Sequence, residues 1–207
     1  MAEARALFIA LEGIDGSGTS TQTGALSACL RDRGHEVHET CEPSRGPIGR
    51  MIRERLSTRC AAIDPAALAL LFAADRLDHL SCEIEPALAR GAVVISDRYV
   101  LSSLVYQSIE CDGPWVQGIN AQARWPDICA LVSLPWDKAV ARVTARQTTA
   151  GGEKERYDTP DLQRQLATGY QHAFETQRPG PIVHINGDRS IAAVTEDLLR
   201  LCVRKGL

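Results

Sequence analysis

Short apolar runs rich in branched residues alternate along the chain with longer segments in which apolar residues recur at a helical period. The runs predict strands at residues 6–11, 37–41, 92–96, 128–134 and 182–185. The longer segments predict helices at residues 20–33, 65–90, 136–146, 161–178 and 191–204, with turns at Gly34, Gly91 and Gly187. Because strands that alternate with helices form parallel sheets covered on both faces, the pattern predicts an α/β fold with ligands at the carboxyl ends of its strands.

The first predicted strand runs into a glycine-rich turn and the start of a helix. Gly13, Gly18 and Ser20 fit the P-loop spacing G-x-x-x-x-G-K-[ST], in which backbone N–H groups and a helix N-terminus cradle phosphates. A glycine-rich turn without a ligand is the simpler alternative, but the apolar run before it and the helical pattern after it favour phosphate binding. The predicted cradle comprises Gly13, Ile14, Asp15, Gly16, Ser17, Gly18, Thr19, Ser20 and Thr21.

Thr19 stands where the P-loop pattern has lysine. Ser20 can still place its hydroxyl on a phosphate-bound Mg²⁺ ion. The point charge that lysine supplies between the transferring phosphates must come from other cations or be absent. The loop therefore predicts phosphate binding and leaves open whether phosphate is transferred.

Asp97 and Arg98 end the predicted buried strand at residues 92–96. At such a position aspartate can hold Mg²⁺ and arginine can neutralise phosphate charge. Charges at the tip of a core strand rarely serve packing, and the P-loop lies at the same end of the predicted sheet. We therefore predict a functional role for both residues, with Ser20 and Asp97 as the metal ligands.

A proline- and glycine-rich segment follows the predicted strand at residues 37–41 and carries Glu42, Arg45 and Arg50. It predicts a turn beside the same sheet edge. Its two arginines either grip an anion or are ordinary surface charges, and the segment alone does not decide between these readings.

Phe72 and Arg76 lie four residues apart in the predicted helix at residues 65–90, hence on one face. An aromatic ring and a guanidinium on one face can together hold a planar base. Core packing with a helix-surface ion pair is the alternative.

The composition favours one soluble domain that acts on small anions. A chain of 207 residues with 44% hydrophobic content can bury a large core, so residues 1–207 are expected to form a single domain. The formal net charge of -3 gives no polybasic field, which argues against nucleic-acid and anionic-membrane partners. The sequence shows neither a leader nor an apolar run long enough for a membrane span. Its 7 cysteines lack the C-x-x-C spacing of metal or redox sites, which favours reduced thiols in the cytoplasm.

A polar, glycine-bearing segment separates the predicted helices at residues 136–146 and 161–178. It spans residues 147–160 and includes Gly151, Gly152 and Arg156. Loops of this kind often close over phosphates. We therefore predict a short lid at about residues 147–160.

Four motifs in order resemble the thymidylate kinase family. They are Glu12-Gly-Ile-Asp-Gly-Ser-Gly, Glu42-Pro with the following Gly-Pro-Ile-Gly, Leu71-Phe-Ala-Ala-Asp-Arg, and Asp97-Arg-Tyr followed by Ser102-Ser-Leu-Val-Tyr-Gln. The resemblance continues through Pro126-Asp127 and Glu155-Arg-Tyr-Asp and so spans nearly the whole chain. It implies a three-layer P-loop NTPase fold that transfers the γ-phosphoryl group of Mg-ATP to dTMP, giving dTDP and ADP.

The resemblance also implies roles for individual residues. Asp15, Arg98, Arg146 and Arg156 would be catalytic, the two last acting from the lid, and residues 13–21 would bind ATP. The dTMP site would include Glu42. Arg45 and Arg98 would serve the acceptor phosphate, and Asp15 the sugar 3′-hydroxyl. Phe72 would stack on thymine with Arg76 at its carbonyl edge, Gln107 and either Ser102 or Ser103 would read the base, and Tyr106 would crowd out a ribose 2′-hydroxyl. A homodimer through the long helix that begins at Pro65 is expected as well.

Two departures from the family pattern keep alternatives open. Thr19 replaces the P-loop lysine, and Cys41 replaces an arginine common before the Glu-Pro pair, although Arg45 nearby can compensate. The lost lysine raises the alternative of a catalytically weak nucleotide-binding protein. A kinase for another, modified deoxypyrimidine monophosphate is a further alternative, which the residues at positions 102–107 would discriminate.

Overall fold

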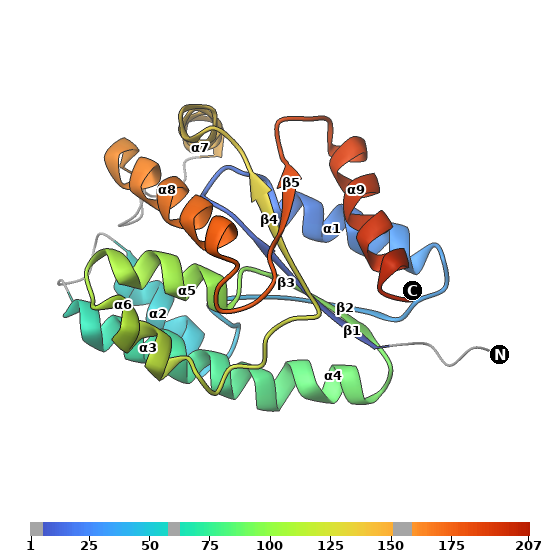
Figure 1. The fold of residues 1–207 in the computed structure, drawn as a ribbon, viewed down its shortest axis with the longest axis horizontal. Coiled ribbons are helices and arrows are strands. Elements are labelled where there is room, and N and C mark those ends of the chain that lie inside the picture. The colour runs from blue at the N-terminus through green and yellow to red at the C-terminus, as the bar shows by residue number, and fades with distance from the viewer. Residues whose placement is uncertain (1–5, 58–62, 151–158) are drawn as a thin grey trace.

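Five parallel strands form one sheet in the computed structural model, which describes residues 6–57, 63–150 and 159–207 (Figure 1). The strand order is β2-β3-β1-β4-β5. The strands are β1 (Leu7–Glu12), β2 (Val37–Cys41), β3 (Val93–Asp97), β4 (Ile128–Ser133) and β5 (Val183–Asn186). Each lies within one residue of a predicted strand, so the predicted α/β fold with a five-stranded parallel sheet is confirmed.

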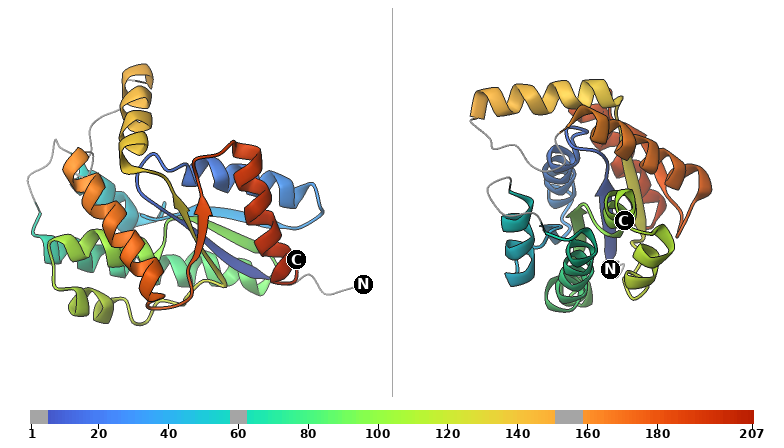
Figure 2. Two further views of the ribbon diagram at one scale, coloured as in Figure 1. Left: turned by 45° about the horizontal axis from the view of Figure 1, so that its top comes forward. Right: turned by 90° about the vertical axis from the view of Figure 1, so that its left-hand side faces the viewer.

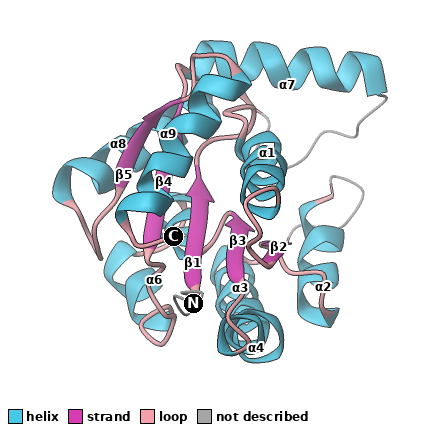
Figure 3. Ribbon diagram, turned by 90° about the vertical axis from the view of Figure 1, so that its right-hand side faces the viewer, coloured by secondary structure: helices cyan, strands magenta, loops and turns pink. Residues whose placement is uncertain are grey.

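Helices cover both faces of the sheet because β1 is apolar on both sides. Leu7, Ile9 and Leu11 pack on one face against α1 (Thr19–Arg31) and α9 (Ile191–Arg204). The alternate residues of β1 lie on the opposite face, where Phe8 and Ala10 share a core cluster with residues from the end of α3 to the start of α5. Figure 3 shows the magenta strands enclosed between cyan helices on either side. This is the three-layer arrangement that the strand–helix alternation predicts.

The predicted helix at residues 65–90 is continuous in extent but changes its winding. It consists of α3 (Pro65–His79), a π-helical turn η1 (Leu80–Ile84) and α4 (Glu85–Ala89). Asp64 caps its start by accepting hydrogen bonds from the backbone N–H groups of Ala66 and Ala67. A π turn adds a residue to the helix and rotates the side chains that follow it.

Three short helices were not predicted. They are α2 (Pro47–Leu56), α5 (Val100–Tyr106) and α6 (Gly113–Ile119), with a 3₁₀ turn η2 (Gln107–Ile109) between the last two. The segment after Glu42 is a turn only as far as Gly46, because Pro47 begins α2. Pro114 likewise stands in the first turn of α6, a position where proline is favoured. The prediction for the segment after Glu42 took its prolines and glycines as turn signals alone.

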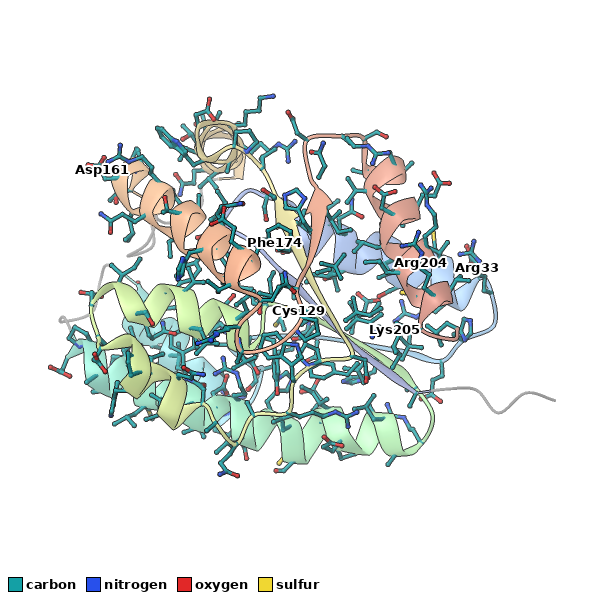
Figure 4. The ribbon with its side chains drawn as sticks, viewed as in Figure 1. Arg33, Cys129, Asp161, Phe174, Arg204 and Lys205 are labelled. Atoms are coloured by element: carbon teal, nitrogen blue, oxygen red, sulfur yellow. The ribbon has the colours of Figure 1, made fainter. Side chains whose placement is uncertain are left out.

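The remaining helices, α7 (Trp136–Ala150) and α8 (Pro160–Thr176), flank the predicted lid. Figure 2 shows α7 standing out from the rest of the molecule. It continues past residue 146, so residues 147–150 of the predicted lid are helical, and residues 151–158 lie outside the described residues. Asp161 lies near the outer end of α8, while Phe174 approaches β5, with its ring 5.4 Å from that of His184 (Figure 4).

Two further findings bear on the sequence-based expectations. None of the helices in the described ranges combines the length and the apolar character that crossing a membrane would require. The cysteines in those ranges are free thiols, with Cys129 and Cys202 buried.

Candidate active site

The register of β1 and β3 brings the P-loop beside the Asp97–Arg98 pair. Leu11 lies opposite Asp97, so both strands end at the same edge, and the backbone N–H of Arg98 donates to the Leu11 carbonyl at 2.9 Å. A cavity of about 430 Å³ opens there, a size typical of small-molecule sites. It is lined by Ile14, Asp15, Gly16, Ser17, Gly18, Thr19, Ser20, Thr21 and Gln22, together with Arg98, Arg142, Arg189 and others. We call it the P-loop pocket; of the predicted cradle, Gly13 alone does not line it.

Two glycines of the loop are required by the close approach of neighbouring backbone. A Cβ atom on Gly13 would lie 2.6 Å from the Val132 carbonyl oxygen, and one on Gly16 would lie 2.4 Å from that of Ala139. Gly16 also has a φ of +84°, which L side chains rarely adopt. The loop therefore packs against the end of β4 and the start of α7. The first N–H groups of α1, which receive no side-chain cap, lie at the pocket.

Ser20 and Asp97, the predicted pair of metal ligands, lie in direct contact. The Ser20 hydroxyl donates to one carboxylate oxygen of Asp97. The other oxygen, Asp97 Oδ1, is buried and has no hydrogen-bond partner in the described residues. A hydroxyl and a carboxylate fit Mg²⁺, which usually takes few protein ligands and keeps water and phosphate oxygens as the rest.

A second pocket adjoins the first and collects the predicted base- and sugar-binding residues. It is lined by Asp15, Glu42, Pro43, Leu56, Phe72, Arg76, Arg98, Tyr99, Ser102, Ser103, Tyr106 and Gln107. We call it the acceptor pocket. Every residue predicted for it is present except Arg45, which is exposed and lines neither pocket. The predicted common face of Phe72 and Arg76 is confirmed.

Arg98 lies where the two pockets meet. Its Nη1 donates to the Gly13 carbonyl at 2.8 Å and its Nη2 to Asp15 Oδ1 at 2.6 Å. Its guanidinium carbon lies 5.1 Å from the centre of the Tyr106 ring, a cation–π distance. Its φ of +69° is unusual for a residue with a side chain, and the turn is held by the Ser96 hydroxyl, which donates to the Arg98 carbonyl at 2.6 Å. Asp15 and Arg98 line both pockets.

Arg76 is 1% exposed and holds its guanidinium in a fixed network. Its Nε and Nη2 donate to Glu42 Oε2 at 2.9 and 2.7 Å, and Nη2 also donates to Ser103 Oγ at 2.9 Å. Its Nη1 donates to Asn120 Oδ1. Of the five N–H groups of the guanidinium, the residues that the structure describes leave one Nη1 N–H for a ligand.

Sequence reasoning assigned no role to Glu12, which is fully buried beneath Arg98. Its Oε1 accepts from the Tyr99 backbone N–H at 2.9 Å, and its Oε2 accepts from the hydroxyls of Ser102 and Tyr170 at 2.6 and 3.2 Å. Those two hydroxyls in turn accept from Arg98 Nη1 at 3.3 and 3.4 Å. Burial raises the pKa of the Glu12 carboxyl to about 7, although Ser102 and Arg98 oppose the rise.

Arg142 and Arg189 were missed as well. Arg142, on α7, donates to the Gly16 carbonyl at 3.4 Å, and Arg189, after β5, pairs with Asp197 at 2.5 Å. Both line the P-loop pocket. Arg142 lies one helical turn before Arg146, on the same face of the predicted helix, and Arg189 follows the turn at Gly187 after a strand end. Both positions could therefore have been predicted from the sequence as belonging to the site. The side chain of Arg146 and the whole of Arg156 lie outside the described residues.

Comparison with known proteins gives a consistent picture. A family model described as thymidylate kinase matches residues 11–198. A probable thymidylate kinase of Pyrococcus abyssi (strain GE5 / Orsay) is 39% identical over 207 residues, covering 95% of this chain and 96% of that protein. A probable thymidylate kinase of Thermococcus kodakarensis is 41% identical over 206 residues, covering 93% and 98%. A thymidylate kinase of Clavibacter sepedonicus is 42% identical over 171 residues, covering 79% and 80%.

The raised pKa of Glu12 predicts a pH-dependent stability term. In the unfolded chain the carboxyl ionises near pH 4.5, whereas in the folded protein it keeps its proton up to about pH 7. The free energy of unfolding should therefore fall as pH rises between these values, by roughly 3 kcal/mol for this group, at 1.36 kcal/mol per pKa unit. Glu12→Gln cannot ionise, so urea unfolding at pH 5 and pH 8 should show the variant gaining stability relative to the parent at pH 8. A stability difference that is the same at both pH values would contradict the raised pKa.

Proposed function

The chain belongs to the thymidylate kinase family, and from that premise we propose how its residues carry out the reaction. It is a nucleoside monophosphate kinase that transfers the γ-phosphoryl group of ATP to dTMP, giving dTDP and ADP. One observation carries the proposal: the P-loop pocket and the acceptor pocket meet at Asp15 and Arg98, which line both. Two nucleotides bound in these pockets would face each other across this pair, as in-line transfer requires.

The P-loop pocket would hold ATP. The uncapped N–H groups at the start of α1 suit its β- and γ-phosphates. Ser20 and Asp97 would hold Mg²⁺, which when bound neutralises charge on the donor phosphates. The unpartnered Asp97 Oδ1 supports this assignment. Arg142 and Arg189 suit contacts with the rest of the nucleotide, since guanidinium groups stack on bases and bind anions.

The acceptor pocket would hold dTMP. Phe72 offers an aromatic face for the base, and the remaining Arg76 N–H suits a carbonyl oxygen at its edge. The buried Gln107 Oε1 has no partner within the part of the chain that the structure describes, so it suits a ring N–H of the base. Asp15 would orient the sugar 3′-hydroxyl, and the Tyr106 ring would crowd a ribose 2′-hydroxyl. Ser102 and Ser103 act through Arg98 and Arg76, which they contact.

Arg98 would stabilise the negative charge of the phosphoryl group during its transfer, together with the predicted lid arginines Arg146 and Arg156. Its contacts to Gly13 and Asp15 hold it between the pockets without a ligand, so little reorganisation would be needed during transfer. Arg98, Arg142 and Arg189 at the P-loop pocket supply positive charge that the missing lysine would otherwise give. This supports an active kinase over a weak nucleotide-binding protein. Arg45 stays a prediction for the acceptor phosphate.

An apolar stripe on α3 supports the predicted homodimer. Ala67, Leu70, Ala74 and Leu77 are exposed at helical spacing, with Leu70 50% and Leu77 41% exposed. Met51, 48% exposed, lies on the adjoining helix α2. Pairing α3 with its copy would bury this stripe around a two-fold axis. We propose a cytoplasmic homodimer that does not bind nucleic acid or membranes.

The reaction is tested by ADP release with Mg-ATP and each deoxynucleoside monophosphate in turn. We expect turnover with dTMP and little with the others, modified deoxypyrimidines included. Arg98→Ala should lower kcat/KM about 1000-fold, because it removes a preorganised charge from the transition state. This variant also controls for contaminating kinases in the preparation. A higher rate with another monophosphate would assign the enzyme a different substrate. Nucleotide binding without any turnover would favour the nucleotide-binding alternative.

Restoring the lysine tests what replaces it. Thr19 is 6% exposed and shares its pocket with three arginines, so the site already holds the positive charge that the transferring phosphates need. Thr19→Lys should therefore change kcat by less than about 10-fold, whereas one missing electrostatic contact is typically worth about 100-fold or more. Thr19→Val, which keeps the size of the side chain, is the matched control. A steep rise with lysine would show that the natural loop is a weakened cradle.

Charge on the stripe tests the dimer. Leu70→Glu should weaken self-association about 100-fold, because a carboxylate would be buried without a partner. The molecular mass in solution is measured by analytical ultracentrifugation over a range of protein concentrations. Val203→Glu, at an apolar residue of α9 that is 58% exposed, is the control and should leave association unchanged. Equal masses for the parent and both variants would remove α3 as the interface.

A further inference from the structure

His79 is a fully buried histidine without a role in the reaction as described so far. Its side chain is 0% exposed, yet it lines neither the P-loop pocket nor the acceptor pocket as the described residues define them. It lies at the end of α3, three residues after Arg76 and therefore about one turn along the same side of the helix. A buried imidazole needs hydrogen-bond partners, and those of His79 lead to the acceptor pocket.

Both ring nitrogens of His79 face hydrogen-bond acceptors. Nδ1 lies 3.2 Å from Glu42 Oε1, and Nε2 lies 2.7 Å from Thr40 Oγ1. Glu83 Oε2 lies 3.6 Å from Nε2. The Thr40 hydroxyl also bonds to the Glu83 carboxylate, which has no proton to give, so this hydroxyl donates there and accepts from Nε2. The His79 ring is therefore held through both of its nitrogens.

These contacts form a ladder between the β2 side and the end of α3 with the π turn η1. His38 and Thr40 on β2 and Glu42, directly after its last residue, alternate along the chain and point to one side. His38 pairs with Glu83 at 2.9 Å, Thr40 with His79, and Glu42 with His79 and Arg76. The π turn that begins after His79 carries Glu83. Although burial opposes it, hydrogen bonds from Thr40 and His38 hold the pKa of the Glu83 carboxyl below its usual value.

Glu42 divides its two oxygens between His79 and Arg76. Oε1 accepts from His79, while Oε2 accepts from both Nε and Nη2 of Arg76. The Glu42 side chain is 3% exposed, so water cannot replace a lost donor at Oε1. Without His79 the carboxylate would rotate to satisfy Oε1 and would pull the Arg76 guanidinium with it. Arg76 offers the base a single N–H, and the direction of this N–H depends on the orientation of the guanidinium plane.

We propose that His79 is a positioning residue for dTMP binding, which fixes Glu42 and through it the base-reading N–H of Arg76. This inference rests on the proposed function, because the acceptor pocket must bind dTMP for Arg76 to read its base. It assigns His79 to the affinity for the monophosphate and to the choice of base. It assigns it no part in ATP binding or in the transfer step.

The test compares His79→Leu, His79→Gln and the control His38→Leu by steady-state kinetics and by calorimetric titration with dTMP. His79→Leu should raise KM and Kd for dTMP about 10-fold, as expected for losing one hydrogen bond to a buried charge. KM for ATP should stay within about twofold, and the preference for dTMP over dCMP should fall. His79→Gln keeps one donor and should recover part of the affinity. His38→Leu touches only the outer end of the ladder and should resemble the parent.

The outcomes separate this inference from the proposed function. If the parent neither binds nor phosphorylates dTMP, both fail together. If the parent does so and folded His79→Leu binds dTMP equally well, only the role of His79 fails. Equal rises in KM for ATP and dTMP, or a lower melting temperature with unchanged KM, would show a purely structural role. Should His79→Leu not fold, His79→Gln decides alone by the ratio of its two KM changes.

Discussion

The parallel pairing of β1 with β3 is the constraint on which the rest of the site depends. Leu11 lies opposite Asp97, so the P-loop and the Asp97–Arg98 pair leave the sheet at one edge. A shift of one residue would turn the side chains of β1 to the other face and would bury the wrong set. Because Leu7, Ile9 and Leu11 pack under α1 and α9 while Phe8 and Ala10 pack on the opposite face, that register is fixed by the core. The relative positions of the site residues are therefore fixed by apolar packing in the core of the sheet, away from the site itself.

Arg98 shows how a charged residue is held at such an edge. Its backbone adopts a positive φ, and its side chain reaches Gly13 and Asp15 on the P-loop side. Beneath it, Glu12 receives hydrogen bonds from Tyr99, Ser102 and Tyr170. Burial raises the pKa of the Tyr170 hydroxyl well above its usual value, so this group stays protonated and can donate. A residue of β1 thus organises the first turn of α5 and a side chain of α8 around one arginine, which would reduce the reorganisation needed in the proposed transfer step.

In the acceptor pocket a second arginine, Arg76, is also held in place by buried hydrogen-bond partners. Arg76 and Glu42 are a buried ion pair, which by itself is weak evidence for stability because both charges lose their hydration. Their additional contacts to Ser103, Asn120 and His79 satisfy most of the remaining polar atoms. Such a network restricts the guanidinium to one plane. In the proposed function this restriction would give specificity for a base, because a wrong base would leave a buried N–H without an acceptor.

The sequence by itself determined the strands, the long helices, the glycine-rich loop and most residues that line the acceptor pocket, but only about half of those that line the P-loop pocket. These features are local: periodicity reports which face of an element is buried, and a motif such as residues 12–18 encodes a backbone shape wherever it occurs. The short helices α2 and α6 escaped because proline and glycine begin helices as well as turns, and only their packing distinguishes the two. The helix α5 escaped because its 7 residues are too few to show a helical period. The contacts of Glu12, His79, Arg142 and Arg189 were decided by the tertiary structure alone. Their partners lie on other elements, and no local pattern records a contact such as that of Glu12 with Tyr170, which are far apart in the chain and meet only when β1 and α8 pack together.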